Sequence, residues 1–182
     1  KGFIGKYFCE KYKKKFNIVK VSREYGNLAI KKNWKNLPKA EIMIQLASLN
    51  SVEKSLSSPN LFFKNNIDLL LNALIYCRKH NCKIIYLSSY VYGRNPTMPT
   101  PETQSTVGSN PYALSKIISE KLISIYADFY NVSSIILRPF NVYGYGQKKT
   151  SIIPMLIDSI RNKKKLNINY PSNTNDYINV ED

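Results

Sequence analysis

The hydrophobic positions fall into short apolar runs that alternate with longer amphipathic stretches. Runs rich in β-branched and aliphatic residues predict four strands, over residues 17–21, 41–47, 83–88 and 133–137. Apolar residues spaced three and four apart predict four helices, over residues 5–15, 60–80, 111–130 and 152–162. This alternation predicts an α/β fold, a Rossmann-like doubly wound parallel sheet with helices on both faces.

Two local signals sharpen this pattern. Residues 90–109 hold three prolines and two glycines, which predicts a loop. Asn110 and Pro111 follow it as a helix cap and a first helical residue, and so predict where the helix 111–130 begins.

Composition excludes several classes of protein. Of the 182 residues, 43% are hydrophobic, which is enough for a core and excludes a fully disordered chain. We expect no membrane association, because no apolar run approaches the roughly 18 residues of a spanning helix. Three cysteines without a CxxC pair and a single histidine predict no metal site. Reduced thiols favour the cytoplasm.

The net charge is +15, from 27 Lys and Arg against 12 Asp and Glu. The lysines are clustered in four separate places and are not interleaved with aromatic residues as in a single-strand groove. Their charge therefore favours ordinary solvated surface, and we expect no nucleic-acid partner. A basic nucleic-acid binder, with affinity for generic DNA that falls steeply with salt, is the alternative hypothesis.

Four motifs lie where α/β proteins bind ligands, and one of them, residues 138–144, stands just past the end of the strand 133–137. Gly2 and Gly5 lead into the first helix, which indicates either a phosphate-binding turn or a plain tight turn. Ser88 and Ser89 end a strand, where hydroxyls either meet a ligand or cap the backbone. Tyr112 and Lys116 lie one turn apart on a helix, and an ammonium there would lower the tyrosine pKa from about 10 and make it an acid/base.

The order and spacing of these motifs carry more information than each motif alone. GFIG, LSSYVYG, NPYALSK, RPFNVYGYGQ and DYINVED follow one another along the whole chain. Together they resemble the NAD-dependent epimerase/dehydratase family of extended short-chain dehydrogenases/reductases, which acts on nucleotide sugars. The resemblance implies hydride transfer at a sugar carbon, by a 4-epimerase or a 4-ketoreductase.

The resemblance also assigns roles to residues. The implied catalytic residues are Ser88, Tyr112 and Lys116, with Tyr112 as the acid/base. The implied substrate contacts are Ser88, Ser89 and Asn141. The implied cofactor contacts are Gly2, Phe3, Ile4, Gly5, Ser22, Arg23, Leu46, Ala47, Asn66, Tyr112, Lys116 and Pro139. The family's 4,6-dehydratases have an Asp-Glu pair after the catalytic hydroxyl residue, and Ser89-Tyr90 in that place argues against dehydration.

The cofactor is NAD or NADP. NAD-preferring members have an Asp where this chain has Ser22-Arg23, and a cation and a hydroxyl suit a 2′-phosphate, so the comparison favours NADP. The alternative is that Arg23 stacks on adenine or points to solvent. Asn66 is expected either at the nicotinamide half of the cofactor or as a buried brace for backbone.

The family's layout predicts an NAD(P)-binding domain over residues 1–147 and the start of a substrate-binding region over residues 148–182. Its first strand and the rest of its C-terminal region have no counterpart here, so we expect a fragment of a longer protein. The helices 60–80 and 111–130 correspond to the family's dimer interface and predict a homodimer, or else they only cover the sheet. A non-catalytic member that keeps the fold is the second functional hypothesis.

Overall fold

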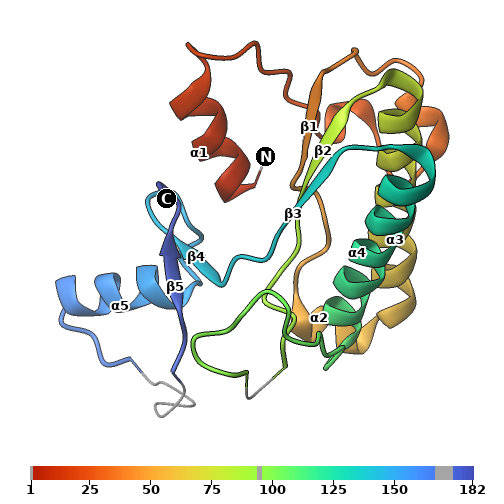
Figure 1. The fold of residues 1–182 in the computed structure, drawn as a ribbon. Coiled ribbons are helices and arrows are strands. Elements are labelled where there is room, and N and C mark those ends of the chain that lie inside the picture. The colour runs from red at the N-terminus through yellow and green to blue at the C-terminus, as the bar shows by residue number, and fades with distance from the viewer. Residues whose placement is uncertain (1, 94–95, 167–173) are drawn as a thin grey trace. The chain divides into compact units, whose positions relative to one another are not determined.

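The structure is a computed structural model that describes residues 2–93, 96–166 and 174–182. The chain forms two compact units, one made of residues 1–18 and 139–182 and the other of residues 19–138. Figure 1 traces both units along the chain.

The larger unit is built on a parallel three-stranded sheet in the order β1-β2-β3. Its strands are β1 (Ile42–Gln45), β2 (Lys83–Leu87) and β3 (Ser134–Leu137). Met43 pairs with Ile84, and Ile84 pairs in turn with Ser134. Because successive residues of a strand point to opposite faces, Met43, Ile84, Tyr86 and Ile136 lie on one face of the sheet.

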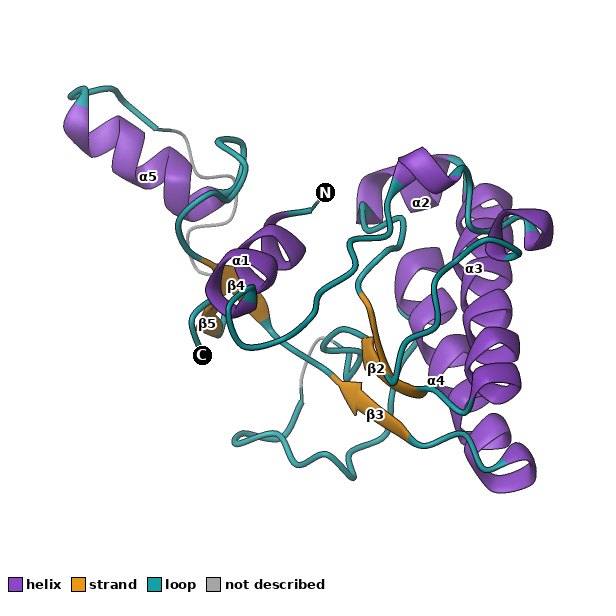
Figure 2. Ribbon diagram, turned by 90° about the horizontal axis from the view of Figure 1, so that it is seen from above, coloured by secondary structure: helices purple, strands orange, loops and turns teal. Residues whose placement is uncertain are grey.

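Two long helices, α3 (Pro59–His80) and α4 (Pro111–Tyr130), cover that face and pack against each other (Figure 2). The core between helices and sheet joins Leu70, Leu74 and Ile123 to Ile84 and Tyr86. The opposite face carries Ile42, Ile135 and Leu137, which are 53%, 56% and 45% exposed. Apolar residues on both faces explain why these strands read as continuous apolar runs.

Local chemistry sets the ends of these helices. The Asn110 side chain accepts from the backbone N–H of Ala113 at 2.9 Å, and Pro111 takes the first helical position, as the sequence predicts. Asn81 and Asn131 adopt the left-handed conformation directly after α3 and α4 and end both helices.

The larger unit also holds three short elements that the sequence pattern did not predict. They are η1 (Arg23–Tyr25), η2 (Lys31–Trp34) and α2 (Val52–Ser57). The Ser51 side chain caps α2 by accepting from Lys54 N–H at 3.2 Å. Residues 90–93 and 96–109 form neither helix nor strand, as predicted for this loop.

The smaller unit contains α1 (Phe3–Tyr12), α5 (Ile152–Arg161) and a parallel two-stranded sheet. The sheet pairs β4 (Asn141–Tyr143) with β5 (Tyr177–Asn179), and neither strand was predicted. Helices were predicted over residues 5–15 and 152–162, so both are confirmed with shifted bounds.

The predicted strand over residues 17–21 is wrong. Residues 17–21 form no strand ladder with any residue that the structure describes, and Val19 and Val21 are 47% and 39% exposed. β-Branched residues favour an extended backbone, but only a neighbouring strand supplies the hydrogen bonds that make a strand.

Candidate active site

The carboxyl end of β2 and the first half of α4 carry all three predicted catalytic side chains. Ser88 and Ser89 follow directly after β2, and Tyr112 and Lys116 lie on the first two turns of α4. Ligands of parallel α/β sheets bind outside the carboxyl ends of the strands, so the topology alone makes this a candidate site.

Ser88 belongs to a buried polar network. It is 4% exposed, and its Oγ donates to Oε1 of Glu120, which is 6% exposed. Arg138 binds the same carboxylate through Nη2 at 2.7 Å and through Nε at 3.1 and 3.2 Å. The bidentate guanidinium supplies the countercharge that a buried carboxylate needs.

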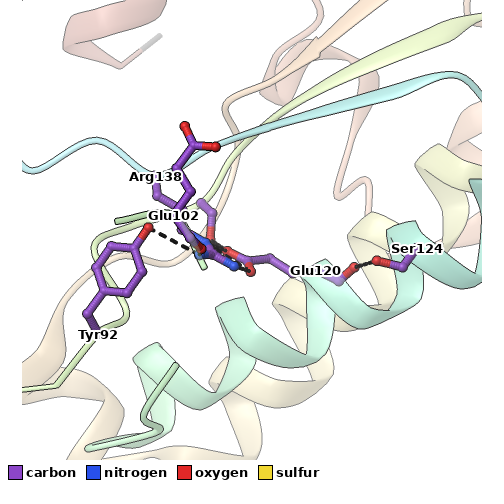
Figure 3. Close-up of polar contacts among 6 residues, drawn as sticks. Tyr92, Glu102, Glu120, Ser124 and Arg138 are labelled. Atoms are coloured by element: carbon purple, nitrogen blue, oxygen red, sulfur yellow. Dashed lines mark hydrogen bonds and ion pairs between the residues drawn. The ribbon is translucent and has the colours of Figure 1, made fainter. Parts of the chain in front are cut away.

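Arg138 is itself held from the far side (Figure 3). Its Nη1 donates to the Tyr92 hydroxyl and to the Glu102 backbone carbonyl, each at 3.1 Å. These bonds tie the network to the loop that follows β2. Gly93 closes this part of the loop with φ +88°, in the left-handed region, and a Cβ there would lie 3.3 Å from Val107. The loop therefore holds Tyr92 against Arg138.

Lys116 is a buried ammonium, 3% exposed. Its Nζ donates to the Leu87 carbonyl at 2.7 Å and lies 4.8 Å from the centroid of the Tyr86 ring. Burial lowers the pKa of Lys116 to about 8, and the Glu120 carboxylate opposes the shift. Lys116 therefore loses its charge in a range where most lysines keep theirs.

Tyr112 does not have the lowered pKa that the sequence predicts. Burial raises the pKa of the Tyr112 phenol, while a hydrogen bond with Ser89 acts in the other direction. The Lys116 ammonium lies 5.9 Å from the centroid of the Tyr112 ring and is bonded to the Leu87 backbone carbonyl. The two serines thus have different partners, since Ser88 bonds Glu120 and Ser89 bonds Tyr112.

Asn66 braces the backbone around this site, as one of its two predicted roles requires. Its side chain accepts from Leu49 N–H at 2.8 Å and donates to the Leu49 carbonyl at 3.1 Å. It also donates to Ser115 Oγ at 3.1 Å, and that hydroxyl donates to the Tyr112 carbonyl at 2.7 Å. Asn66 therefore connects the segment after β1 to the turn of α4 that carries Tyr112. A cofactor contact from Asn66 stays a prediction.

The other predicted cofactor residues of the larger unit lie on short connections. Ser22 and Arg23 stand at the start of η1, where the Ser22 carbonyl accepts from Tyr25 N–H at 3.0 Å, and the Arg23 side chain lies outside what the structure describes. Leu46 and Ala47 follow β1, and Gln45 donates to the Ala47 carbonyl at 3.2 Å.

The smaller unit holds the remaining predicted residues. Gly2 caps α1, and Phe3, Ile4 and Gly5 form its first turn. Asn141 begins β4 shortly after Pro139, and its backbone N–H and side-chain amide both donate to the Asp176 carbonyl, at 3.2 and 3.1 Å. Asn141 therefore braces the start of β5, and its contact with substrate stays a prediction.

Each unit by itself offers donors of a type that suits one part of a dinucleotide. In the smaller unit, the first-turn N–H groups of α1 have no partner within the helix and are donors of the kind that suit phosphate oxygens. Lys116 has three N–H donors, of which the Leu87 carbonyl takes one, and Tyr112 adds a hydroxyl. Such donors suit ribose hydroxyls.

Sequence reasoning missed Glu120, and it assigned no role to Arg138 or Tyr92, although both lie in motifs that it singled out. A signal for Glu120 was present, because Tyr112, Lys116 and Glu120 are spaced four apart and so lie along one face of α4. A carboxylate in line with two predicted catalytic residues is unusual on a face that meets a sheet. Arg138 follows β3 directly, at the same sheet edge as Ser88.

Comparison with known proteins settles the family. The model of the NAD dependent epimerase/dehydratase family matches residues 1–182. The chain belongs to this family. The resemblance in the sequence is thereby confirmed, as is the α/β, Rossmann-like fold. No helix in the described parts of the chain is both long and apolar enough to cross a membrane.

Two of the matched proteins bear the names of UDP-sugar 4-epimerases. The chain is 30% identical to a putative UDP-glucose 4-epimerase of Methanocaldococcus jannaschii, over 81% of this chain and 50% of that protein. It superposes with a TM-score of 0.82 and 28% identity on the UDP-N-acetylglucosamine 4-epimerase of Methanobrevibacter ruminantium in complex with UDP-N-acetylmuramic acid. That match covers 99% of this chain and 66% of the other.

A third match is RMD from Pseudomonas aeruginosa complexed with NADPH, with 25% identity and a TM-score of 0.82, over 99% of this chain and 68% of that one. The chain thus spans about half to two thirds of the length of these proteins.

Proposed function

We propose that the whole protein is an NAD(P)-dependent nucleotide-sugar epimerase or 4-ketoreductase that uses Tyr112 as its acid/base. The observation that carries the proposal is the gathering of Ser88, Ser89, Tyr112 and Lys116 where β2 ends and α4 begins. The bound cofactor supplies hydride transfer with the sugar carbon. UDP-sugars are the proposed substrates, because the named relatives include 4-epimerases of UDP-glucose and UDP-N-acetylglucosamine.

In this proposal the chain's own residues bind, orient and move the proton. Tyr112 takes a proton from the sugar hydroxyl or returns one to the ketone, and Ser89 steadies the phenol through their hydrogen bond. Lys116, held by the Leu87 carbonyl, directs its remaining N–H groups to the cofactor ribose. A bound ribose would bring the ammonium its own partners and keep it near Tyr112, which favours the phenolate.

Two activities remain within the proposal, and cofactor turnover separates them. A 4-ketoreductase consumes NADPH or NADH in proportion to product, whereas an epimerase interconverts two UDP-sugars with no net change in cofactor absorbance. The whole protein is therefore incubated with UDP-glucose or UDP-N-acetylglucosamine, and both products and cofactor are measured. If neither sugar is converted and no UDP-sugar binds, the proposal fails in favour of a non-catalytic member of the fold.

NADP preference is part of the proposal and rests on Ser22-Arg23 in place of an acidic residue. The Michaelis constants for NADPH and NADH test it directly. Arg23→Ala would raise the constant for NADPH about tenfold and change that for NADH little, as expected for one charged contact to a phosphate. Equal effects on both cofactors would argue that Arg23 stacks on adenine.

We further propose a cytoplasmic homodimer that pairs through α3 and α4. Cys9, Cys77 and Cys82 are free thiols, as a reducing compartment predicts. Leu61, Ile125 and Phe129 are 58%, 46% and 76% exposed on these helices and offer apolar area to a second copy. Sedimentation of the whole protein, with Phe129→Lys as the disrupting variant, tests the dimer.

A further inference from the structure

The contact between Ser88 and Glu120 sets the direction of a hydrogen bond. An ionised carboxylate only accepts hydrogen bonds, and the ion pair with Arg138 balances the negative charge of Glu120. The single proton of the Ser88 hydroxyl therefore points to Glu120. Ser88 Oγ can therefore offer any other partner only its lone pairs, as a hydrogen-bond acceptor.

The surroundings keep that direction fixed. Hydrogen bonds to charged groups are about twice as strong as neutral ones, and water has little access because Ser88 and Glu120 are 4% and 6% exposed. Arg138 cannot swing away with the carboxylate, since Tyr92 and the Glu102 carbonyl hold its other end. The Ser88 hydroxyl is therefore held in one orientation by Glu120, which Arg138, Tyr92 and the Glu102 carbonyl keep in place.

Ser88 also stands next to the residue that bonds Tyr112. Ser89 hydrogen-bonds the Tyr112 phenol, whereas Ser88 donates its hydrogen bond to the buried Glu120 carboxylate. A locked hydroxyl at this position accepts a hydrogen bond from a substrate hydroxyl and cannot readily donate one.

We propose that Glu120 is a positioning residue that acts on the reaction through Ser88, turning its oxygen lone pairs toward a hydroxyl donor of the nucleotide sugar, with Arg138 holding the carboxylate in place. The inference rests on the proposed function, and deepens it by assigning Ser88 the role of acceptor. The competing explanation is that Glu120 and Arg138 only stabilise the fold.

A double-mutant cycle in the whole protein separates these explanations. Ser88→Ala, Glu120→Gln and the double variant are compared with the unchanged protein in UDP-sugar turnover. We expect Glu120→Gln to lower kcat about tenfold, with KM within about twofold, because a Gln amide can donate as well as accept and no longer fixes the direction of the Ser88 hydroxyl. In the Ser88→Ala background the same change should lower kcat less than about twofold. An equal loss in both backgrounds would overturn the proposal.

Ser124→Ala is the matched control, because Ser124 Oγ donates to the Glu120 backbone carbonyl at 3.2 Å and lies outside the network (Figure 3). It should leave kcat unchanged. Glu120→Gln leaves Arg138 without its carboxylate, so Glu120→Gln combined with Arg138→Gln provides a variant with no unpaired charge. It should show the same loss of kcat and the same dependence on Ser88.

A substrate-free measurement distinguishes failure of this inference from failure of the proposed function. The same cycle is run on denaturant midpoints, where replacement of the charged acceptor of Ser88 by a weaker neutral one must make the two changes non-additive. Additive midpoint shifts overturn the inference whether or not the protein is an enzyme. Non-additive shifts in a protein that converts no UDP-sugar leave the bond in place and overturn the proposed function, together with the positioning role of Glu120 in the reaction.

Discussion

The two halves of α4 do different work, although they belong to one uninterrupted helix. The first half buries polar side chains, and Ser115, Lys116, Ser119 and Glu120 are each at most 6% exposed. Among the described residues, each of these side chains has a hydrogen-bond partner. The second half buries Ile123 and leaves Ile125 and Phe129 exposed.

The difference shows which kind of burial makes a site. Burying hydrocarbon is favourable wherever it fits, so the second half stabilises the fold without demanding particular partners. Burying Lys116 and Glu120 costs desolvation that only well-placed partners offset, and such groups tolerate few alternative arrangements. The first half therefore sacrifices stability for fixed geometry, which is what proton transfer and ligand binding require.

The largest expected difference between the two halves of α4 comes from removing the phenol oxygen of Tyr112. Tyr112→Phe should lower UDP-sugar turnover by about 10²- to 10⁴-fold, since it removes the proposed acid/base, while the protein stays folded. Tyr126→Phe makes the same change in the second half, where the ring packs 4.9 Å from Tyr130, and should leave turnover within about twofold. Full activity of the first variant would remove Tyr112 from the reaction.

Substitutions in the second half of α4 should instead lower the stability of the fold and leave turnover unchanged. Ile123 is 1% exposed in the core beneath the helices, so Ile123→Ala should lower the unfolding free energy by about 2–5 kcal/mol. Turnover per folded molecule should not change. Ile160→Ala, at a residue that is 76% exposed on α5 and lies outside the helices of the proposed dimer, is the control and should cost about 0.5 kcal/mol. Denaturant titrations and a turnover assay measure both effects. If Ile123→Ala lowered turnover per folded molecule, the second half of α4 would also contribute to the site.

The buried charge of Lys116 predicts a pH dependence of stability. Its pKa is about 8 in the folded protein against an ordinary 10.5, so between these values the unfolded chain binds more protons than the folded one. The unfolding free energy should therefore rise with pH from about 8 to 10.5, by at most about 1.4 kcal/mol per pH unit from this group.

Denaturant titrations of the cofactor-free protein at several pH values measure this slope. Lys116→Met should flatten it, whereas Lys121→Met, at an exposed lysine of the same helix, should not. A slope that is the same in all three proteins would mean that Lys116 keeps its charge across this range.

The parts of the fold that the sequence predicts are those with local causes. Asn110, Pro111 and the apolar spacing of residues 111–130 lie within one helix, so its start and end follow from neighbouring residues. Residues 17–21 have equally strong β-branched character, but whether they form a strand depends on a pairing neighbour elsewhere in the chain. β4 and β5 have three residues each, too few for alternation to show.

The candidate site divides in the same way. The spacing of Tyr112 and Lys116 and the position of Ser88 after a strand are visible in the sequence. Arg138 meets Glu120 across 18 positions, and only the packing of α4 against β3 brings them together. The shift in the Tyr112 pKa was predicted with the wrong sign, because its main cause is burial, which no spacing reveals.

The smallest expected effect provides the closest test of the two halves, because the same bond occurs in both. Ser119 Oγ donates to the Ser115 carbonyl at 2.8 Å, and Ser124 Oγ donates to the Glu120 carbonyl at 3.2 Å. Ser119 is fully buried and its hydroxyl also bonds the Tyr86 phenol, whereas Ser124 is exposed.

Ser119→Ala should cost about 1 kcal/mol of unfolding free energy, since it leaves the buried Tyr86 phenol without that partner. Ser124→Ala should change the unfolding free energy by less than about 0.5 kcal/mol, because water replaces the lost bond and alanine favours helix. Parallel denaturant titrations compare the two. Equal costs would mean that the hydroxyl-to-carbonyl bond matters more than its surroundings, and that the two halves differ less than their burial indicates.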